Sequence, residues 1–166
     1  MRKFIRIKKE VLFTHAELVQ RADKWLRNTK RCGFTFRELV CYNTSGEIPD
    51  NIGFRYGESY LIECKTSRAD FFVDKKKLFR YYSNQGMGNY RYYMTCPDLI
   101  KPSELPEKWG LLYVFKKQVR QIIEPEKFFN TARRELPLLY SALRRVQLRG
   151  DLDEIYNFEL IKKEAK

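Results

Sequence analysis

The sequence predicts a single α/β domain, and three observations support this prediction. Thr14 and Ser67 are good helix N-caps, and each is followed three residues later by an acidic residue that completes a capping box or a similar pair. Short apolar runs bounded by turn residues lie between and after these helix starts and predict strands. The chain has 166 residues, of which 43% are hydrophobic, so it can bury a proper core. We therefore expect one domain over residues 1–166, with a core at about 14–124 and a C-terminal helical extension at about 125–160.

The first helix and the strand after it begin the domain. The helix should span residues 14–30. Its apolar stripe at helical spacing consists of Leu18, Ala22, Trp25 and Leu26. Residues 33–42 then read as a strand in which Glu38 shares a face with apolar side chains, an unfavourable place for an unpaired carboxylate. Glu38 should therefore either support the site described below, at a metal or at Lys65, or reach solvent through a bulge.

A β-hairpin at residues 46–65 is the most informative segment of the chain. Two apolar runs flank a short Tyr56-Gly57-Glu58 turn. A turn at the first two of these residues pairs Asp50 with Glu63, whereas a turn at the last two pairs Asp50 with Lys65. Either register puts all three side chains on one face of the hairpin, because directly opposite residues point the same way.

Two carboxylates and an ammonium at one strand end suit metal-assisted phosphodiester hydrolysis. Mg²⁺ or Mn²⁺ accepts carboxylates and keeps water or phosphate oxygens in its other positions. Asp50 and Glu63 would bind the ion, and the Cys64 carbonyl would be a third oxygen ligand. Lys65 would orient the water or stabilise the developing oxyanion, and it could act as a base only if its pKa were strongly lowered. The alternative is an ordinary surface hairpin with a solvated glutamate and lysine.

A basic helix should leave this strand at Ser67. Its apolar stripe consists of Phe71, Leu78, Phe79 and Tyr82. The rest of its surface bears the cationic side chains of Lys75, Lys76, Lys77 and Arg80. These side chains are placed to contact phosphates, and the alternative is a solvated helix face.

Three strands and a helical region complete the chain. The strands are expected at residues 90–95, 110–115 and 117–123. Pro125 should start the helical region, with a break near Pro137. This region also carries several arginines. The sequence does not decide whether the region covers the sheet, binds phosphates or forms a homodimer. The chain contains no Walker phosphate-binding loop, which argues against nucleotide hydrolysis.

The composition restricts the partners and the compartment. A net charge of +12 and a pI near 9.6 favour polyanions such as DNA or RNA. The cysteines at positions 32, 41, 64 and 96 show no Cys-x-x-Cys spacing, and the only histidine, His15, is expected on the helix surface rather than at a metal. Neither a zinc site nor a catalytic Cys–His pair is therefore expected. The absence of a signal peptide or a long apolar segment predicts a reducing, cytoplasmic compartment and no membrane partner.

The hairpin resembles the core of the PD-(D/E)XK nuclease superfamily. Residues 63–72, Glu-Cys-Lys-Thr-Ser-Arg-Ala-Asp-Phe-Phe, resemble its MmcB-like branch, which includes bacterial proteins associated with DNA repair and phage proteins. The similarity covers about residues 33–124. It implies a restriction-endonuclease-like αβββαβ core, with a mixed central sheet flanked by helices, in a bacterial or phage-infected cell. It also implies that Asp50, Glu63 and Lys65 form the active-site triad.

The resemblance adds further candidate site residues. Ser67, Arg68 and Arg91 lie in its matching segments and join the candidate DNA contacts. Glu17 is a candidate for the extra acidic residue that many superfamily members have on the first helix, although its capping-box role also explains it. Glu47 lies in a loop and would reach the metal only if the loop folded back; solvent exposure is the alternative.

These inferences together predict a Mg²⁺- or Mn²⁺-dependent deoxyribonuclease of DNA repair, recombination or phage DNA metabolism. The main alternative is a non-catalytic DNA-binding module that keeps the fold. The two carboxylates argue against that alternative, because without a metal they repel phosphate. An enzyme acting on RNA or on a nucleotide is a third reading, and a repair or phage replication protein could be a partner.

Overall fold

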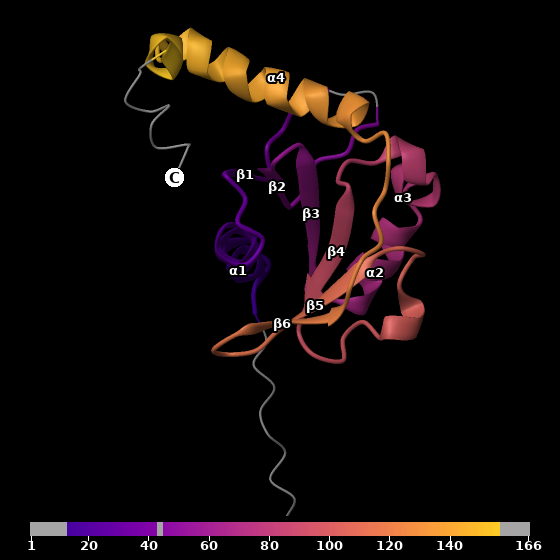
Figure 1. Ribbon diagram of the computed structural model, residues 1–166. Helices are drawn as coiled ribbons and strands as arrows, with labels where there is room; N and C mark the ends of the chain where they lie inside the picture. Colours follow the sequence, from indigo (N-terminus) through magenta and orange to yellow (C-terminus); the bar gives the residue numbers. More distant parts are fainter. Residues whose placement is uncertain (1–12, 43–44, 157–166) are drawn as a thin grey trace, which may run out of the picture.

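The computed structural model describes residues 13–42 and 45–156 and shows a six-stranded mixed sheet with helices around it (Figure 1). The strands are β1 Phe34–Arg37, β2 Asn51–Arg55, β3 Glu58–Lys65, β4 Tyr90–Thr95, β5 Gly110–Val114 and β6 Val119–Ile123. The helices are α1 His15–Asn28, α2 Arg68–Lys75, α3 Leu78–Tyr81 and α4 Ala132–Arg149, with 3₁₀ segments at Ser83–Gln85, Pro102–Glu104 and Leu152–Tyr156.

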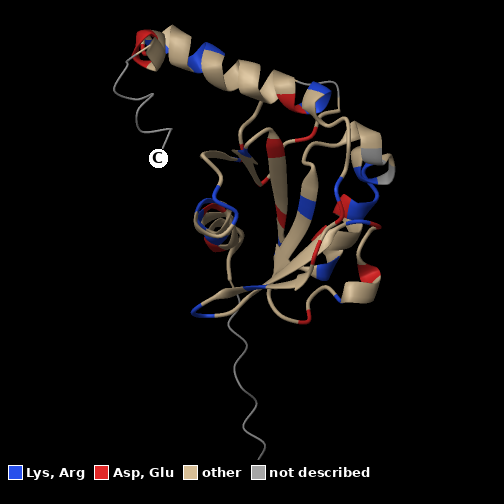
Figure 2. Ribbon diagram, in the orientation of Figure 1, with Lys and Arg blue, Asp and Glu red and all other residues tan. Residues whose placement is uncertain are grey.

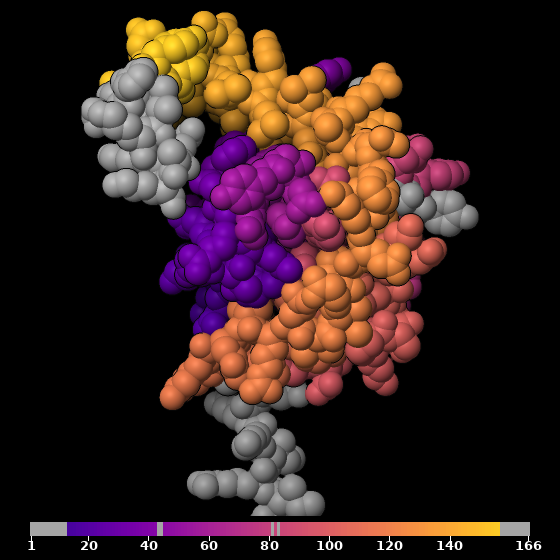
Figure 3. Space-filling view, viewed as in Figure 1, coloured from indigo at the N-terminus to yellow at the C-terminus, as the bar shows by residue number. Residues whose placement is uncertain are grey.

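The strands lie in the sheet in their order along the chain. The β3–β4 and β4–β5 pairs are parallel, and the other neighbours are antiparallel. Helix α1 covers one face of the sheet, and α2 and α3 lie on the other (Figure 1). Helix α4 crosses one end of the sheet and extends beyond it, as the space-filling view also shows (Figure 3). The prediction of an α/β fold with a mixed sheet flanked by helices is therefore confirmed.

Side chains alternate along β3 between two hydrophobic cores. Ile62 and Cys64 pack beneath α1 against residues such as Trp25. Leu61 points to the opposite face and packs with the core that contains Phe71 of α2. This alternation places every second side chain of β3 toward α2 and α3.

The hairpin between β2 and β3 adopts the first of the two predicted registers. Arg55 pairs with Glu58, so the turn consists of Tyr56 and Gly57, whose φ angles are 49° and 77°. Positive φ at both central residues is the requirement of a type I′ turn, which glycine satisfies at the second position. Asn51 pairs with Ile62, so this register places Asp50 opposite Glu63, the next residue of β3.

The first strand and the basic helix differ most from their predictions. The first strand ends at Arg37 because Glu38 has a φ of 47°, and the Glu38 side chain is 57% exposed rather than on an apolar face. The predicted basic helix is divided into α2 and α3, and Leu78 and Tyr82 of its expected buried stripe are exposed. The local backbone conformation at Glu38 and between α2 and α3 causes these differences. The spacing of apolar residues in the sequence does not predict that conformation.

Helix α4 begins later than predicted and continues through Pro137. It starts at Ala132, and proline removes only one backbone hydrogen bond within it. Glu135 Oε1 accepts a 2.9 Å hydrogen bond from the Gly88 N–H, and Leu138 is fully buried. These anchors hold the helix against the sheet end on either side of Pro137.

The C-terminal extension is described only in part. A short 3₁₀ segment follows α4 and ends at Tyr156, whereas the predicted extension to about residue 160 reaches past the described residues. No helix within residues 13–42 and 45–156 combines the length and hydropathy that crossing a bilayer requires.

Candidate active site at the end of strand β3

Asp50, Glu63 and Lys65 meet where β2 begins and β3 ends. Asp50 directly precedes β2, and its Oδ2 accepts a 2.7 Å hydrogen bond from the Cys64 N–H. Glu63 and Lys65 lie on the side of β3 that faces α2 and α3, and Lys65 Nζ lies 3.2 Å from Glu63 Oε2. The structure thus brings together the three side chains that the hairpin pattern places on one face.

A cleft of about 260 Å³ opens over this end of the sheet. The residues that line it are His15, Asp50, Cys64, Lys65, Asp70, Val73, Asp74 and Lys77. Glu63 is buried and does not line the cleft. A substrate in the cleft would therefore contact Asp50 and Lys65 directly, whereas Glu63 would contact Lys65 from the protein interior.

The protonation of Asp50 and Lys65 follows from their burial and their neighbours. Burial and the negative charge of Glu63 raise the pKa of Asp50 to about 6. Burial alone would lower the pKa of Lys65, but the carboxylates of Glu63, Asp74 and Asp50 outweigh it and raise that pKa above its ordinary value. Lys65 is therefore an ammonium at neutral pH, and the structure does not support a role as a base.

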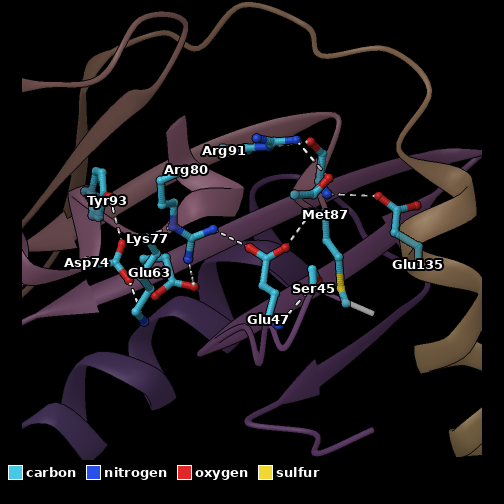
Figure 4. Close-up of polar contacts among 12 residues, drawn as sticks. Ser45, Glu47, Glu63, Asp74, Lys77, Arg80, Met87, Arg91, Tyr93 and Glu135 are labelled. Carbon is cyan, nitrogen blue, oxygen red and sulfur yellow. Dashed lines mark hydrogen bonds and ion pairs between the residues drawn. The ribbon is translucent and has the colours of Figure 1, made fainter. Parts of the chain in front are cut away.

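Arg80 is buried among three carboxylates (Figure 4). Its Nη2 lies 2.7 Å from Glu63 Oε1, its Nε donates a 3.0 Å hydrogen bond to Asp74 Oδ2, and its Nη1 pairs with Glu47. Glu47 also accepts a 2.6 Å hydrogen bond from the Met87 N–H and is fully buried. The prediction that Glu47 is exposed to solvent is wrong, because the loop folds back onto Arg80.

Asp74 belongs to the same buried cluster and was not predicted from the sequence as a site residue. Its Oδ2 accepts a 2.8 Å hydrogen bond from the Tyr93 hydroxyl. Burial would raise the pKa of Asp74, but the charges of Arg80 and Lys65 overcome this and hold it well below its usual range. Asp74 follows the buried Phe71 by three residues, so it lies on the inward face of α2. An acidic residue at that spacing in a basic helix is the signal that could have identified it.

Two of the predicted DNA contacts are buried and cannot reach a phosphate. Arg80 is held in the carboxylate cluster, and Arg91 is fully buried. Arg91 donates hydrogen bonds of 3.0 and 2.9 Å to the carbonyl oxygens of Gly88 and Gly86, and its guanidinium lies over the Phe128 ring. The predictions for Arg80 and Arg91 are therefore wrong, because both long side chains find acceptors inside the protein.

The other predicted DNA contacts lie nearer to the surface. Ser67 is the N-cap of α2. Arg68 pairs with the Glu104 carboxylate, and Lys75 Nζ donates a 2.6 Å hydrogen bond to the Glu104 carbonyl. Lys76 is exposed, and Lys77, whose side chain is 47% exposed, lines the cleft.

The remaining acidic candidates, Glu17 and Glu38, differ in their position relative to the cleft. Glu17 forms the capping box with Thr14, in which Thr14 N–H donates a 2.8 Å hydrogen bond to Glu17 Oε2, and it does not line the cleft. Its proposed place at the metal is therefore not supported. Glu38, in contrast, lies beside the cleft, with its Oε1 3.3 Å from His15 Nε2. His15 Nε2 is also 3.6 Å from Asp50 Oδ1, a proximity that the helix pattern around His15 did not indicate.

The donor set fits a divalent cation. Asp50 and Glu63 offer carboxylate oxygens, the ligands that hard cations prefer, and Cys64, which directly follows Glu63, lines the cleft. Both oxygens of Glu63 face cationic groups, namely Lys65 and Arg80, so Glu63 would share its oxygens with them. Asp50 is therefore the carboxylate best placed to bind an ion in the cleft.

In metal-free buffer, the raised pKa of Asp50 should lower the free energy of unfolding as the pH rises. The folded protein keeps this proton up to about pH 6, whereas an unfolded chain releases it near pH 4, so the folded state binds more protons in this window. Asp50→Asn should therefore gain stability relative to the natural chain between pH 4 and 7, by up to about 3 kcal/mol. Urea unfolding in EDTA at several pH values measures this difference, and a difference independent of pH would contradict the assignment.

Comparison with known proteins supports the fold. No protein-family model and no curated protein matches the chain. A solved structure described as "SPO1766 protein of unknown function from Silicibacter pomeroyi" superimposes with a TM-score of 0.59 at 23% sequence identity. The match covers 85% of this chain and 94% of that chain. At this identity the similarity is one of fold.

Proposed function

We propose that this protein is a metal-dependent nuclease that hydrolyses DNA phosphodiester bonds. The observation that supports this most is the convergence of Asp50, Glu63 and Lys65 beside one cleft. Glu63 and Lys65 stand at the carboxyl end of β3, next to the parallel strand β4. Ligands of open α/β sheets bind outside the carboxyl ends of such strands.

The residues of the site have separate roles in this proposal. Asp50, Glu63 and the Cys64 carbonyl would hold Mg²⁺ or Mn²⁺, which would supply a Lewis acid for the phosphate and lower the pKa of a bound water. Lys65, as an ammonium, donates to the phosphate oxygens and stabilises the negative charge that develops on them. Glu63 orients Lys65 through their 3.2 Å contact.

The charge of the molecule favours a polyanionic substrate. The chain has a net charge of +12, and Lys and Arg residues occur on α1, on α4 and around α2 and α3 (Figure 2). Lys77 lines the cleft itself, and Lys76, its neighbour in the sequence, is exposed. These groups would neutralise backbone phosphates on either side of the reacting one.

Cleavage of DNA with and without Asp50 tests the proposal. Supercoiled plasmid and a labelled single strand are incubated with the protein in Mg²⁺, Mn²⁺ or EDTA. We expect cleavage in the metals only, and a loss of roughly 10²–10³-fold in Asp50→Asn. Asp153→Asn, which removes the same charge from an exposed residue of the last 3₁₀ segment, should cleave like the natural chain.

The other outcomes separate the alternatives. DNA binding without cleavage in every metal would favour the non-catalytic DNA-binding module. Cleavage by Asp50→Asn at the natural rate would exclude the proposed site. Thermal unfolding of each variant shows that the proteins compared are folded.

A further inference from the structure

We infer that His15 and Glu38 bind a cation together with Asp50, and that this set of one nitrogen and two oxygen ligands selects Mn²⁺ over Mg²⁺. The inference deepens the proposed function and rests on it, because Asp50, the carboxylate of the nuclease site best placed to bind an ion in the cleft, is one of the three ligands.

The three side chains come from three elements that hold them in place. His15 is the first residue of α1, whose capping box fixes the first turn. Glu38 follows β1, and its N–H donates a 3.0 Å hydrogen bond to the Asp50 carbonyl. The β1–β2 pairing thus continues as far as Glu38 and Asp50, and His15 meets them from the helix above that pair.

The distances match those around one metal ion. His15 Nε2 lies 3.3 Å from Glu38 Oε1 and 3.6 Å from Asp50 Oδ1, and one ligand atom of each residue lies within 4.8 Å of both others. Ligands at about 2.0–2.2 Å from one ion lie roughly 3–4 Å apart. No other group of three His, Cys, Asp or Glu residues meets this distance criterion in the part of the chain that the structure describes.

A direct hydrogen-bonded cluster accounts less well for this geometry. His15 Nε2 and Glu38 Oε1 are within hydrogen-bond distance at 3.3 Å, but a second carboxylate, that of Asp50, faces the same nitrogen at 3.6 Å. Both distances exceed the 2.7–2.9 Å that is typical of charge-assisted hydrogen bonds. The His15 and Glu38 side chains are 44% and 57% exposed, and that of Asp50 is 16% exposed. An ion here would be open on the cleft side, where water or a substrate phosphate could bind it.

The ligand types decide the choice of metal. Carboxylates suit Mg²⁺ and Mn²⁺ alike, whereas imidazole suits transition metals. Mg²⁺ dehydrates reluctantly and is rarely held by a full set of protein ligands. His15 should therefore raise the affinity for Mn²⁺ and leave the affinity for Mg²⁺ low.

The single histidine of the chain makes a direct spectroscopic test available. Full-length protein without a histidine tag is freed of metal and titrated with MnCl₂, and free Mn²⁺ is measured by electron paramagnetic resonance. Electron spin echo modulation of the bound Mn²⁺ then reports coupling to the ¹⁴N of an imidazole. We expect one bound ion with this coupling, and displacement by Mg²⁺ only at a concentration at least about tenfold higher.

Variants assign the ligands. His15→Ala should lose the nitrogen coupling and at least about tenfold in Mn²⁺ affinity, and Glu38→Gln should lose affinity but keep the coupling. Asp70→Asn, which changes a carboxylate of the same cleft outside the ligand set, should bind Mn²⁺ like the natural chain.

Two results would overturn the inference: bound Mn²⁺ without nitrogen coupling in the natural chain, or unchanged Mn²⁺ affinity in folded His15→Ala. Either result together with cleavage in Mg²⁺ would refute the inference and leave the nuclease proposal standing. Nitrogen-coupled Mn²⁺ without cleavage of DNA would support the inference and refute the nuclease proposal.

Discussion

Arg80→Met should reduce the free energy of unfolding by about 3–5 kcal/mol, because it removes the cation that three buried carboxylates share. The Arg80 side chain is 1% exposed and contacts Glu47, Glu63 and Asp74. Methionine is comparable in length and apolar, so the main change is the loss of positive charge. The three carboxylates would then take up protons more readily, and the loss should be smaller at pH 5 than at pH 8.

Lys77→Met is the matched control for this prediction. Lys77 Nζ lies 2.9 Å from Asp74 Oδ1, but its side chain is 47% exposed. Solvent screens the exposed ammonium of Lys77, and Asp74 keeps its contacts with Arg80 and Lys65, so this change should cost at most about 1 kcal/mol. Urea unfolding of both variants at the two pH values measures the effects. Equal losses in Arg80→Met and Lys77→Met would show that burial of the cluster is not what matters.

Lys65→Met should lower the rate of DNA cleavage by roughly 10²–10³-fold, because it removes a cation aimed at the developing negative charge. Glu63 and Asp74 keep their contacts with Arg80 in this variant, so the fold should be retained. Lys65→Arg keeps the charge but changes its position, and it should recover part of the rate.

Single-turnover cleavage with saturating protein separates this effect from weaker binding. Lys76→Met removes an exposed lysine that does not line the cleft, and it should change DNA affinity rather than the single-turnover rate. A Lys65→Met protein that cleaves at the natural rate would remove Lys65 from the proposed chemistry. Because the pKa of Lys65 is raised, the rate should also show no loss from its deprotonation near neutral pH.

The sequence was sufficient for the hairpin because every determinant of the hairpin is local. A turn with Gly57 and strict alternation along β3 decide which residues share a face. The predicted juxtaposition of Asp50, Glu63 and Lys65 depended only on these two facts.

The buried cluster could not be predicted, because contacts distant in the sequence decide it. Glu47 contacts Arg80, which lies 33 positions later, and the Tyr93 hydroxyl donates to Asp74, which lies 19 positions earlier. By residue type alone, each of these charged side chains would be assigned to the surface. The position of Glu38 beside His15 depends on one positive φ angle, which the strand pattern does not contain.

Because each strand pairs with its neighbour in the sequence, the chain can fold in the order in which it is synthesised. Each new strand adds to the edge of an existing sheet, so loop-closure costs stay modest. The acidic and basic groups of the cleft lie between positions 15 and 77, and Arg80 follows directly. Helix α4 can form the hydrogen bond between Glu135 and Gly88 only after the residues of the cleft have been synthesised. The cleft should thus be assembled before the C-terminal helix docks, and α4 should be the first element to detach when the protein opens.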